Sequence, residues 1–134
     1  MSAVAMVQAN SVTKQVNTQE GTLTILHPIS MRVMAGESLA ITGASGSGKS
    51  TLLGILAGLD VPSTGEVILN GNNLSQLDEE GRAKVRAGNV GFIFQSFQLL
   101  PGLSAHENVM LPLELRGDKA ASSKAREFLE RVGL

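Results

Sequence analysis

A glycine-rich loop that ends in lysine and serine is the part of this sequence with the clearest chemistry. Residues 43–50 read GASGSGKS, which fits the pattern G-x-x-x-x-G-K-S of loops that bind nucleotide phosphates. Because glycine lacks a Cβ atom, Gly43, Gly46 and Gly48 let the backbone turn tightly and approach an anion closely. Backbone N–H groups at the start of a following helix would face the phosphates, and the helix dipole favours negative charge there. The loop therefore predicts a phosphate-binding site.

The neighbouring residues decide between this prediction and a flexible Gly/Ser linker. An apolar run over residues 39–41 precedes the loop and indicates a buried strand, and a helical pattern follows it. Average residue frequencies make a chance match in a chain of this length rarer than about one per cent. Lys49 would reach the β- and γ-phosphates, and the Ser50 hydroxyl would bind Mg²⁺. The predicted nucleotide contacts are Gly43, Ala44, Ser45, Gly46, Ser47, Gly48, Lys49, Ser50 and Thr51.

Composition narrows the class of protein. The chain has 134 residues, enough for one ordinary domain, and carries 12 acidic and 11 basic side chains, so its net charge is −1. No basic excess points to nucleic acid as a partner. The absence of cysteine excludes a disulfide framework and thiolate metal sites. Since the sequence has no apolar run long enough to span a membrane and no signal-peptide pattern, we expect a cytoplasmic protein.

Short apolar alternations and turn residues predict the elements of the first part of the chain. A strand is expected over residues 4–13, a turn over 15–21, and further strands over 23–33 with a break at Pro28. The loop helix should occupy residues 49–57 and stop at Gly58. A short strand over 66–69 should turn back at Asn70 and Gly71.

The second part of the chain reads as helices around one apolar strand. Asp78 is the expected N-cap of a helix that ends near residue 87. Residues 90–94, VGFIF, indicate a strand buried on both faces. Ser104 and Glu107 have capping-box spacing at the start of another helix, which Pro112 should kink or end. A final helix is expected over residues 119–132.

Three stretches of this sequence resemble one family. GASGSGKSTLLGILAGLD, PSTGEVILNG and VGFIFQSFQLLPGLSAHENVMLPLELRG are similar to the N-terminal half of an ATP-binding cassette (ABC) transporter ATPase. The sequence of the last stretch is similar to that of the subgroup that serves lipoprotein release and macrolide export. The resemblance implies an incomplete α/β fold, a P-loop NTPase domain of the ABC nucleotide-binding type, with an antiparallel β subdomain and the start of a helical subdomain. Residues 1–95 would hold the ATP-binding core and the antiparallel subdomain, and residues 96–134 the Q-loop and the start of the helical subdomain.

The resemblance also assigns roles to residues that the pattern alone leaves as ordinary surface or strand positions. The glutamine that matches Gln95 binds Mg²⁺, positions the attacking water, and begins the loop that faces the membrane subunit. From Gln95 through Phe97, Leu99, Leu100 and Pro101, we therefore expect a docking surface for a permease. The family usually stacks adenine on an aromatic residue before the phosphate loop. Val16 stands at that position here, so an aliphatic contact with the base replaces stacking.

The family's signature motif, its Walker B acidic pair and its switch histidine all follow the point where these 134 residues stop. Glu114 follows an apolar run, but Pro112 makes that run a poor central strand, so we reject Glu114 as the catalytic base. By resemblance, the Walker B and switch-histidine strands would lie between the loop strand and the strand over residues 90–94. These residues alone are therefore expected to bind nucleotide without turning it over.

Three hypotheses follow. The first is the ATP-binding subunit of an ABC transporter, with ATP and Mg²⁺ as cofactors, acting as a homodimer attached to a membrane permease at the inner face of the membrane. The second is a nucleotide-binding module or fragment that does not hydrolyse ATP. The third is a small P-loop kinase or other NTPase, which would need an arginine-rich lid. The arginines at positions 82, 86, 116, 126 and 131 lie on amphipathic segments and are better explained as solvated helix faces.

Overall fold

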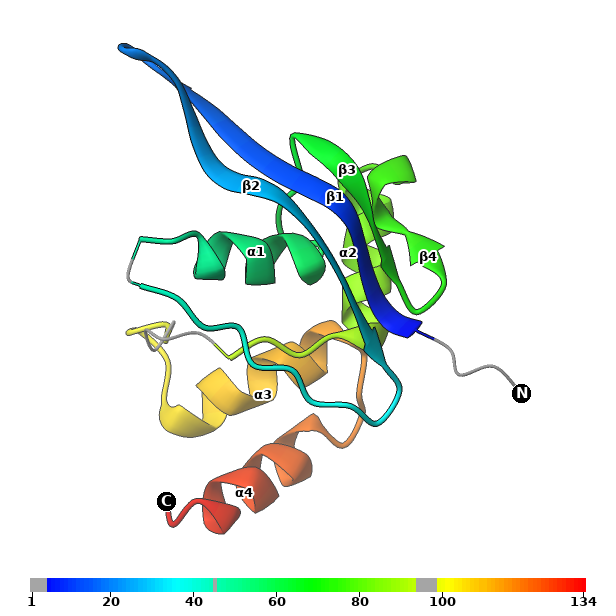
Figure 1. Ribbon diagram of the computed structural model, residues 1–134. Coiled ribbons are helices and arrows are strands. Elements are labelled where there is room, and N and C mark those ends of the chain that lie inside the picture. The colour runs from blue at the N-terminus through cyan, green and yellow to red at the C-terminus, as the bar shows by residue number, and fades with distance from the viewer. Residues whose placement is uncertain (1–4, 45, 94–98) are drawn as a thin grey trace, which may run out of the picture. The chain divides into compact units, whose positions relative to one another are not determined.

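The computed structural model of the protein describes residues 5–44, 46–93 and 99–134. These residues form two compact units, Met1–Phe92 and Ile93–Leu134. The first unit is built on a β-sheet with helices beside it, and the second is a pair of helices (Figure 1).

An antiparallel sheet in the order β2-β1-β3-β4 forms the frame of the first unit. Its strands are β1 (Ala5–Thr18), β2 (Gly21–Met34), β3 (Thr64–Leu69) and β4 (Asn72–Asn73). β1 and β2 form a hairpin that continues beyond the residues paired with β3 (Figure 1). The prediction of a turn over residues 15–21 is wrong, because β1 stays paired with β2 up to its end and only residues 19–20 form the turn.

The predicted break at Pro28 is a bulge inside a continuous strand. The pairing of β1 with β2 moves from Val12–Ile29 to Lys14–Leu26, so two residues of β2 lie opposite one residue of β1. Proline has no N–H group to give to the ladder, and a bulge is one of the places where a strand accepts it. β2 therefore runs through Pro28 without ending.

A second bulge, in β1, depends on a glycine in β3. Ser11 adopts a positive φ of 48° and donates its backbone N–H to the Ser30 hydroxyl at 2.9 Å. Gly65 lies across from it with φ of +86°, and a Cβ atom on Gly65 would stand 2.3 Å from the Ser11 carbonyl oxygen. Since no side chain fits at that distance, the close approach of β1 and β3 requires glycine at this position.

Helix α1 (Lys49–Leu56) packs its apolar side against the sheet and forms the core with it. The core residues are Ala9, Val12, Leu26, Leu52, Ile55, Leu56, Val67, Leu69 and Leu74. The predicted stop of this helix is confirmed, since Gly58 follows it with φ of 81°. The predicted turn is confirmed as well, because Asn70 and Gly71 both adopt positive φ between β3 and β4, as a two-residue hairpin requires.

A short 3₁₀ helix, η1 (Leu74–Gln76), leads into α2 (Glu79–Asn89). Asp78 caps α2 as predicted, accepting a hydrogen bond from the Gly81 N–H at 2.8 Å. The helix continues two residues beyond its predicted end at residue 87.

The two apolar segments predicted to be buried strands have no strand partners in the described part of the chain. Residues 37–44 and 90–93 form neither helix nor strand, and Ile93 is 97% exposed. A strand is buried only where neighbouring strands pair with its backbone. Both segments instead line an apolar cavity of about 360 Å³ beside α1, with Leu39, Ile41, Val90 and Phe92 among its walls. Residue 94, the end of the second predicted strand, lies outside the described residues.

The second unit consists of α3 (Ala105–Leu115) packed against α4 (Ala121–Arg131). The capping box is confirmed, since Ser104 accepts from the Glu107 N–H at 3.1 Å and Glu107 accepts from the Ser104 N–H at 3.0 Å. The Ser104 N–H, which donates to the charged carboxylate, and the nearby Ser104 hydroxyl lower the pKa of Glu107.

Pro112 does not end α3, which continues to Leu115. Only one helical turn follows the proline, so the helix loses a single backbone hydrogen bond, the one that residue 112 cannot donate. Glu114 lies in this helix, which agrees with its rejection as a residue following a strand. No helix in the described ranges combines the length and the apolar character that crossing a bilayer requires.

Replacement of Gly65 by alanine should destabilise the protein by at least about 1–3 kcal/mol, because the added methyl group meets the backbone of Ser11. Gly88 in α2 has open space at its Cβ position, so Gly88→Ala is the matched control and should be neutral or stabilising by up to about 1 kcal/mol. Chemical denaturation of both variants measures the difference. Equal stability of the two variants would contradict the packing of β1 on β3.

Candidate nucleotide-binding site

The glycine-rich loop comes close to the sheet at its last glycine. Gly48 precedes α1 with φ of +92°, and a Cβ atom on it would lie 2.9 Å from the Ile25 carbonyl oxygen and 3.0 Å from the Leu26 side chain. Ile25 itself lies at a register shift of β2, between the pairs Lys14–Leu26 and Gln15–Thr24. The loop can approach the sheet this closely only because residue 48 is glycine.

The N-terminal end of α1 is open. Gly48 is the N-cap and has no side chain to cap the first turn, and that turn contains no acidic residue. The first intrahelical bond runs from the Leu52 N–H to the Gly48 carbonyl at 2.9 Å. The N–H groups of the preceding residues are the ones that a helix leaves without internal partners, and they carry the positive end of the helix dipole. This end of the helix is therefore arranged to receive an anion.

Internal hydrogen bonds give the loop its shape. The Ser47 N–H donates to the Ala44 carbonyl at 3.1 Å, and the Lys49 ammonium folds back to donate to the Gly43 carbonyl. A Cβ atom on Gly43 would lie 2.7 Å from the Ser47 hydroxyl oxygen, so a side chain at residue 43 would require that hydroxyl to turn away. Lys49 and Thr51 are half-buried, while Ser50 is exposed.

The structure places the described loop residues, 43–44 and 46–51, around the start of α1. Ser45 and Gln95 lie outside the described residues. Val16 is half-buried in β1, paired with Leu23 of β2. The residues of the β1–β2 hairpin that come close to the loop, at Gly48, are Ile25 and Leu26.

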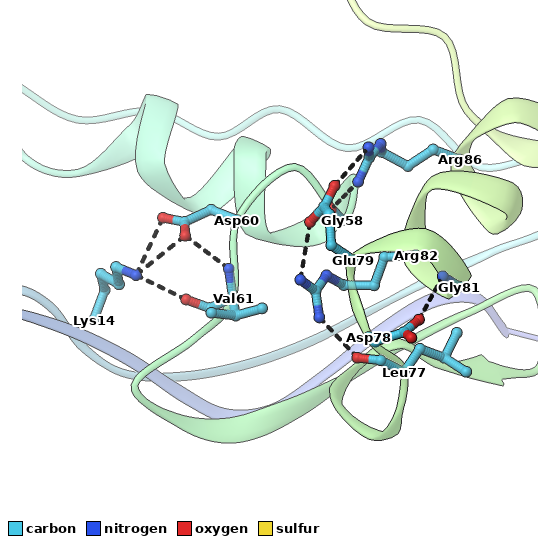
Figure 2. A network of polar contacts seen from close by, with 10 residues as sticks. All are labelled: Lys14, Gly58, Asp60, Val61, Leu77, Asp78, Glu79, Gly81, Arg82 and Arg86. Atoms are coloured by element: carbon cyan, nitrogen blue, oxygen red, sulfur yellow. Dashed lines mark hydrogen bonds and ion pairs between the residues drawn. The ribbon is translucent and has the colours of Figure 1, made fainter.

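A network of charged residues holds the opposite, C-terminal end of α1. Arg86 of α2 donates to the Gly58 carbonyl at 2.5 Å and to Glu79 at 3.1 Å, and Lys14 of β1 donates to the Val61 carbonyl at 2.9 Å (Figure 2). Arg82 joins the network through Glu79 at 2.9 Å. Hydrogen bonds from the two guanidinium groups lower the pKa of Glu79.

The sequence interpretation of these arginines as solvated is wrong for two of them. The side chains of Arg82 and Arg86 are only 16% and 21% exposed. Both are held because a carboxylate at Glu79 lies three and seven residues before them, on the same side of the helix. That spacing is the signal from which the sequence could have predicted the pairing of Glu79 with the two arginines, though not their contact with the end of α1.

The second unit has an apolar cavity of its own, of about 340 Å³. It lies among the residues before α3 and the two helices, and its lining consists of Leu99, Leu100, Pro101, Leu103, Ala105, Asn108, Val109, Leu129 and Leu134. Asn108 ties the loop to α3, since its side chain accepts from the Leu100 N–H at 2.8 Å and donates to the Leu103 carbonyl at 3.2 Å.

Residues 26–134 match the ABC transporter family. The chain belongs to the ABC transporter ATP-binding family. It is 52% identical to the uncharacterized ABC transporter ATP-binding protein YbbA of Escherichia coli K12, over the whole chain and 60% of that protein. It is 47% identical to LolD of Coxiella burnetii, the lipoprotein-releasing system ATP-binding protein, over 82% of this chain and 48% of that protein. The predicted resemblance is confirmed.

The solved structure of the ATP-binding cassette MJ0796, a dimer in a post-hydrolysis state bound to ADP and Pi, is similar with a TM-score of 0.87 at 37% identity. The similarity covers 93% of this chain and 56% of that chain. The predicted α/β cassette fold is therefore confirmed as part of an ABC ATPase domain. The chain spans about half to three-fifths of the length of these ABC relatives.

Proposed function

We propose that this protein is the ATP-binding subunit of an ABC transporter and that residues 43–51 bind the phosphates of ATP. The open N-terminal end of α1, with Lys49 beside it, is the observation that supports the proposal most strongly. It offers N–H donors, a favourable dipole and a cation in one place, as phosphate recognition requires.

Phosphate binding would change the hydrogen-bond partner of Lys49. Its ammonium group now donates to a neutral acceptor, the Gly43 carbonyl. A hydrogen bond to a phosphate oxygen has charge on both partners, so the attraction between opposite charges is added to that of the hydrogen bond. Only the Lys49 side chain has to move in this exchange, and the close approach of Gly48 to the Ile25 carbonyl can remain unchanged.

Mg²⁺ fits the same site. This ion usually takes one or two protein ligands and fills its shell with phosphate oxygens and water. The exposed Ser50 hydroxyl, at the start of α1, can supply such a ligand, and Gln95 is proposed as a second ligand that also positions the attacking water. In the described ranges no group of three or more His, Cys, Asp or Glu side chains forms a metal cage. Bound Mg²⁺ would neutralise charge on the β- and γ-phosphates.

Hydrolysis, dimerisation and transport are proposed for the whole protein, of which this chain spans a part. Residues 1–95 would form the ATP-binding core with the antiparallel subdomain, and residues 96–134 would begin the helical subdomain. Two subunits would enclose two ATP molecules, closure would drive a membrane permease, and hydrolysis would reset it. The protein would then lie at the cytoplasmic face of the membrane through that permease.

The segment after Gln95 is proposed to contact the permease. Leu99 is 65% exposed, and with Leu100 and Pro101 it borders the apolar cavity beside α3. Exposed apolar side chains around a cavity are typical of interaction surfaces. Phe97, also assigned to this surface from the sequence, lies outside the described residues.

Mg·ATP at one hundred times its dissociation constant should stabilise the protein by about 2.7 kcal/mol. Lys49→Ala should lose most of this gain, because the cation that faces the β- and γ-phosphates is removed. Lys84→Ala, which removes an exposed lysine of α2, is the matched control and should keep it. Thermal unfolding with and without Mg·ATP measures the effect. Identical shifts for the wild type and Lys49→Ala would refute the loop as the phosphate site.

Adenine is proposed to contact Val16 without stacking, so ATP and GTP should bind within about tenfold of each other. Val16→Tyr should tighten ATP binding by about 0.5–1.5 kcal/mol, the value of a stacked aromatic pair. Titration calorimetry compares this variant with Val7→Tyr, a change of the same kind in the same strand. Unchanged or weaker ATP binding by Val16→Tyr would remove Val16 from the site.

The proposed permease contact can be tested by crosslinking, since the chain has no cysteine of its own. A cysteine at Leu99 in the full-length protein should crosslink to a cytoplasmic segment of its membrane subunit in vesicles. A cysteine at Ser123, an exposed position of α4 that does not line the cavity, should not. Crosslinks from Leu99 that form only within the chain would mean that these residues cover the protein's own core.

A further inference from the structure

The C-terminal end of helix α1, which lies far from the phosphate loop, is held in place by hydrogen bonds. Its eight residues span about 12 Å. At the C-terminal end the Gly58 N–H donates to the Ile55 carbonyl at 3.1 Å and the Leu59 N–H donates to the Gly54 carbonyl at 2.8 Å. These two bonds form a Schellman motif, which leaves the Gly58 carbonyl free to accept a bond from outside the helix.

Arg86 supplies that bond. Its guanidinium group donates to the Gly58 carbonyl oxygen at 2.5 Å and, through its other nitrogen, to Glu79 at 3.1 Å (Figure 2). A Cβ atom on Gly58 would lie 3.4 Å from the Cγ atom of Arg86, so the arginine stem also packs against this turn. A cation at the C-terminal end of a helix is favoured by the helix dipole.

Lys14 of β1 makes a second connection to the residues just after the helix. Its ammonium group donates to the Val61 carbonyl at 2.9 Å and to the Asp60 carboxylate at 3.2 Å, and Asp60 also accepts from the Val61 N–H at 2.8 Å (Figure 2). The sheet and α2 thus each contribute one cation to the same end of α1.

These hydrogen bonds restrict a movement that the apolar core resists only weakly, the sliding of α1 along its own axis. Leu52, Ile55 and Leu56 hold α1 on the sheet by burial, which has no preferred direction and resists sliding of the helix weakly. Hydrogen bonds have preferred lengths and angles, so they fix the helix along its axis. A shift of α1 along that axis would move its first N–H groups away from the loop that begins at Gly43.

We propose that Arg86, assisted by Lys14, is a positioning residue for the phosphate site at the opposite end of α1. The proposal rests on the proposed function of residues 43–51. Arg86 touches no nucleotide in this account and acts through the position of the helix. Its removal should therefore weaken the binding of any ligand held by the phosphate loop, whether or not the ligand carries a base.

Arg82 provides a matched control within the same network. It lies on the same helix, pairs with the same Glu79 at 2.9 Å, and is similarly buried, but its other bond goes to the Leu77 carbonyl at 2.7 Å and leaves α1 untouched. Arg82→Gln therefore removes an ion pair of the same kind without releasing the helix.

The test is titration calorimetry of the full chain with Mg·ATP and with magnesium tripolyphosphate, which has phosphates but no base. Arg86→Gln should lower the binding affinity for both ligands by the same factor. We expect a factor of roughly 2 to 30, the usual range for residues coupled to a site they do not contact. Arg82→Gln should bind both within twofold of the wild type. Arg86→Lys, which keeps one donor for the Gly58 carbonyl, should recover part of the affinity. If Arg86→Gln does not fold, Lys14→Gln, which removes the bonds to Asp60 and Val61, is expected to lower the affinity for both ligands in the same way.

The outcomes separate the two proposals. Arg86→Gln binding within twofold of the wild type, or Arg82→Gln weakening binding as much as Arg86→Gln, would overturn the role of Arg86 while leaving the phosphate loop in place. Loss of affinity for ATP alone, with tripolyphosphate unaffected, would also overturn it. A wild-type chain that binds neither ligand, with melting behaviour that shows it folded, would overturn the proposed function and this inference together.

Discussion

The close approach of Gly48 to the Ile25 carbonyl is the contact on which the arrangement of the site depends. It lets the start of α1 lie close against β2, and the burial of Leu52 and Ile55 then lays the helix along the sheet face. The loop before the helix has little other support, since residues 43–47 are exposed where they are described. A side chain at residue 48 would push the loop from the sheet and move every N–H group that faces the proposed phosphates.

The two ends of α1 differ in electrostatics. The C-terminal end has two cations, Arg86 and Lys14, where the helix dipole favours them. The N-terminal end has no capping side chain and no acid, and it places Lys49 where the dipole disfavours a cation. Departures from ordinary helix rules that fall together at one place are expected at functional sites. The missing cap and the lysine at the positive end of the dipole both make the start of α1 less stable. This loss of stability is consistent with a helix end that is kept open for an anion.

Local sequence signals predicted local structure well. The Asp78 N-cap, the Ser104 capping box and the turn at Asn70 and Gly71 were predictable because each depends on residues close in the sequence. The irregular structure of residues 37–44 and 90–93 was not predictable, because the formation of a buried strand depends on distant strands that pair with it. The Gly65 contact with Ser11 was invisible for the same reason.

The residues of the loop could be predicted from the sequence because glycine, lysine and serine at fixed spacing have few other uses. The charges that hold the far end of α1 could not, because Arg86 and Gly58 lie 28 residues apart and meet only through the packing of α2. The composition of α2 suggested solvated arginines. Only the fold shows that Glu79 gathers two of them over the end of the neighbouring helix.

Phosphate binding at the start of α1 can be measured directly through the chemical shifts of backbone amides in a ¹⁵N-labelled chain, whose mass of 14.0 kDa suits the method. On addition of Mg·ATP, the largest changes in shift are expected at Gly46, Gly48, Lys49, Ser50 and Thr51, whose N–H groups would meet the phosphates. Shifts at α3 and α4 should be small by comparison. Saturable shifts centred on other residues, with the loop amides unchanged, would contradict the claim that the N-terminal end of α1 is the phosphate site.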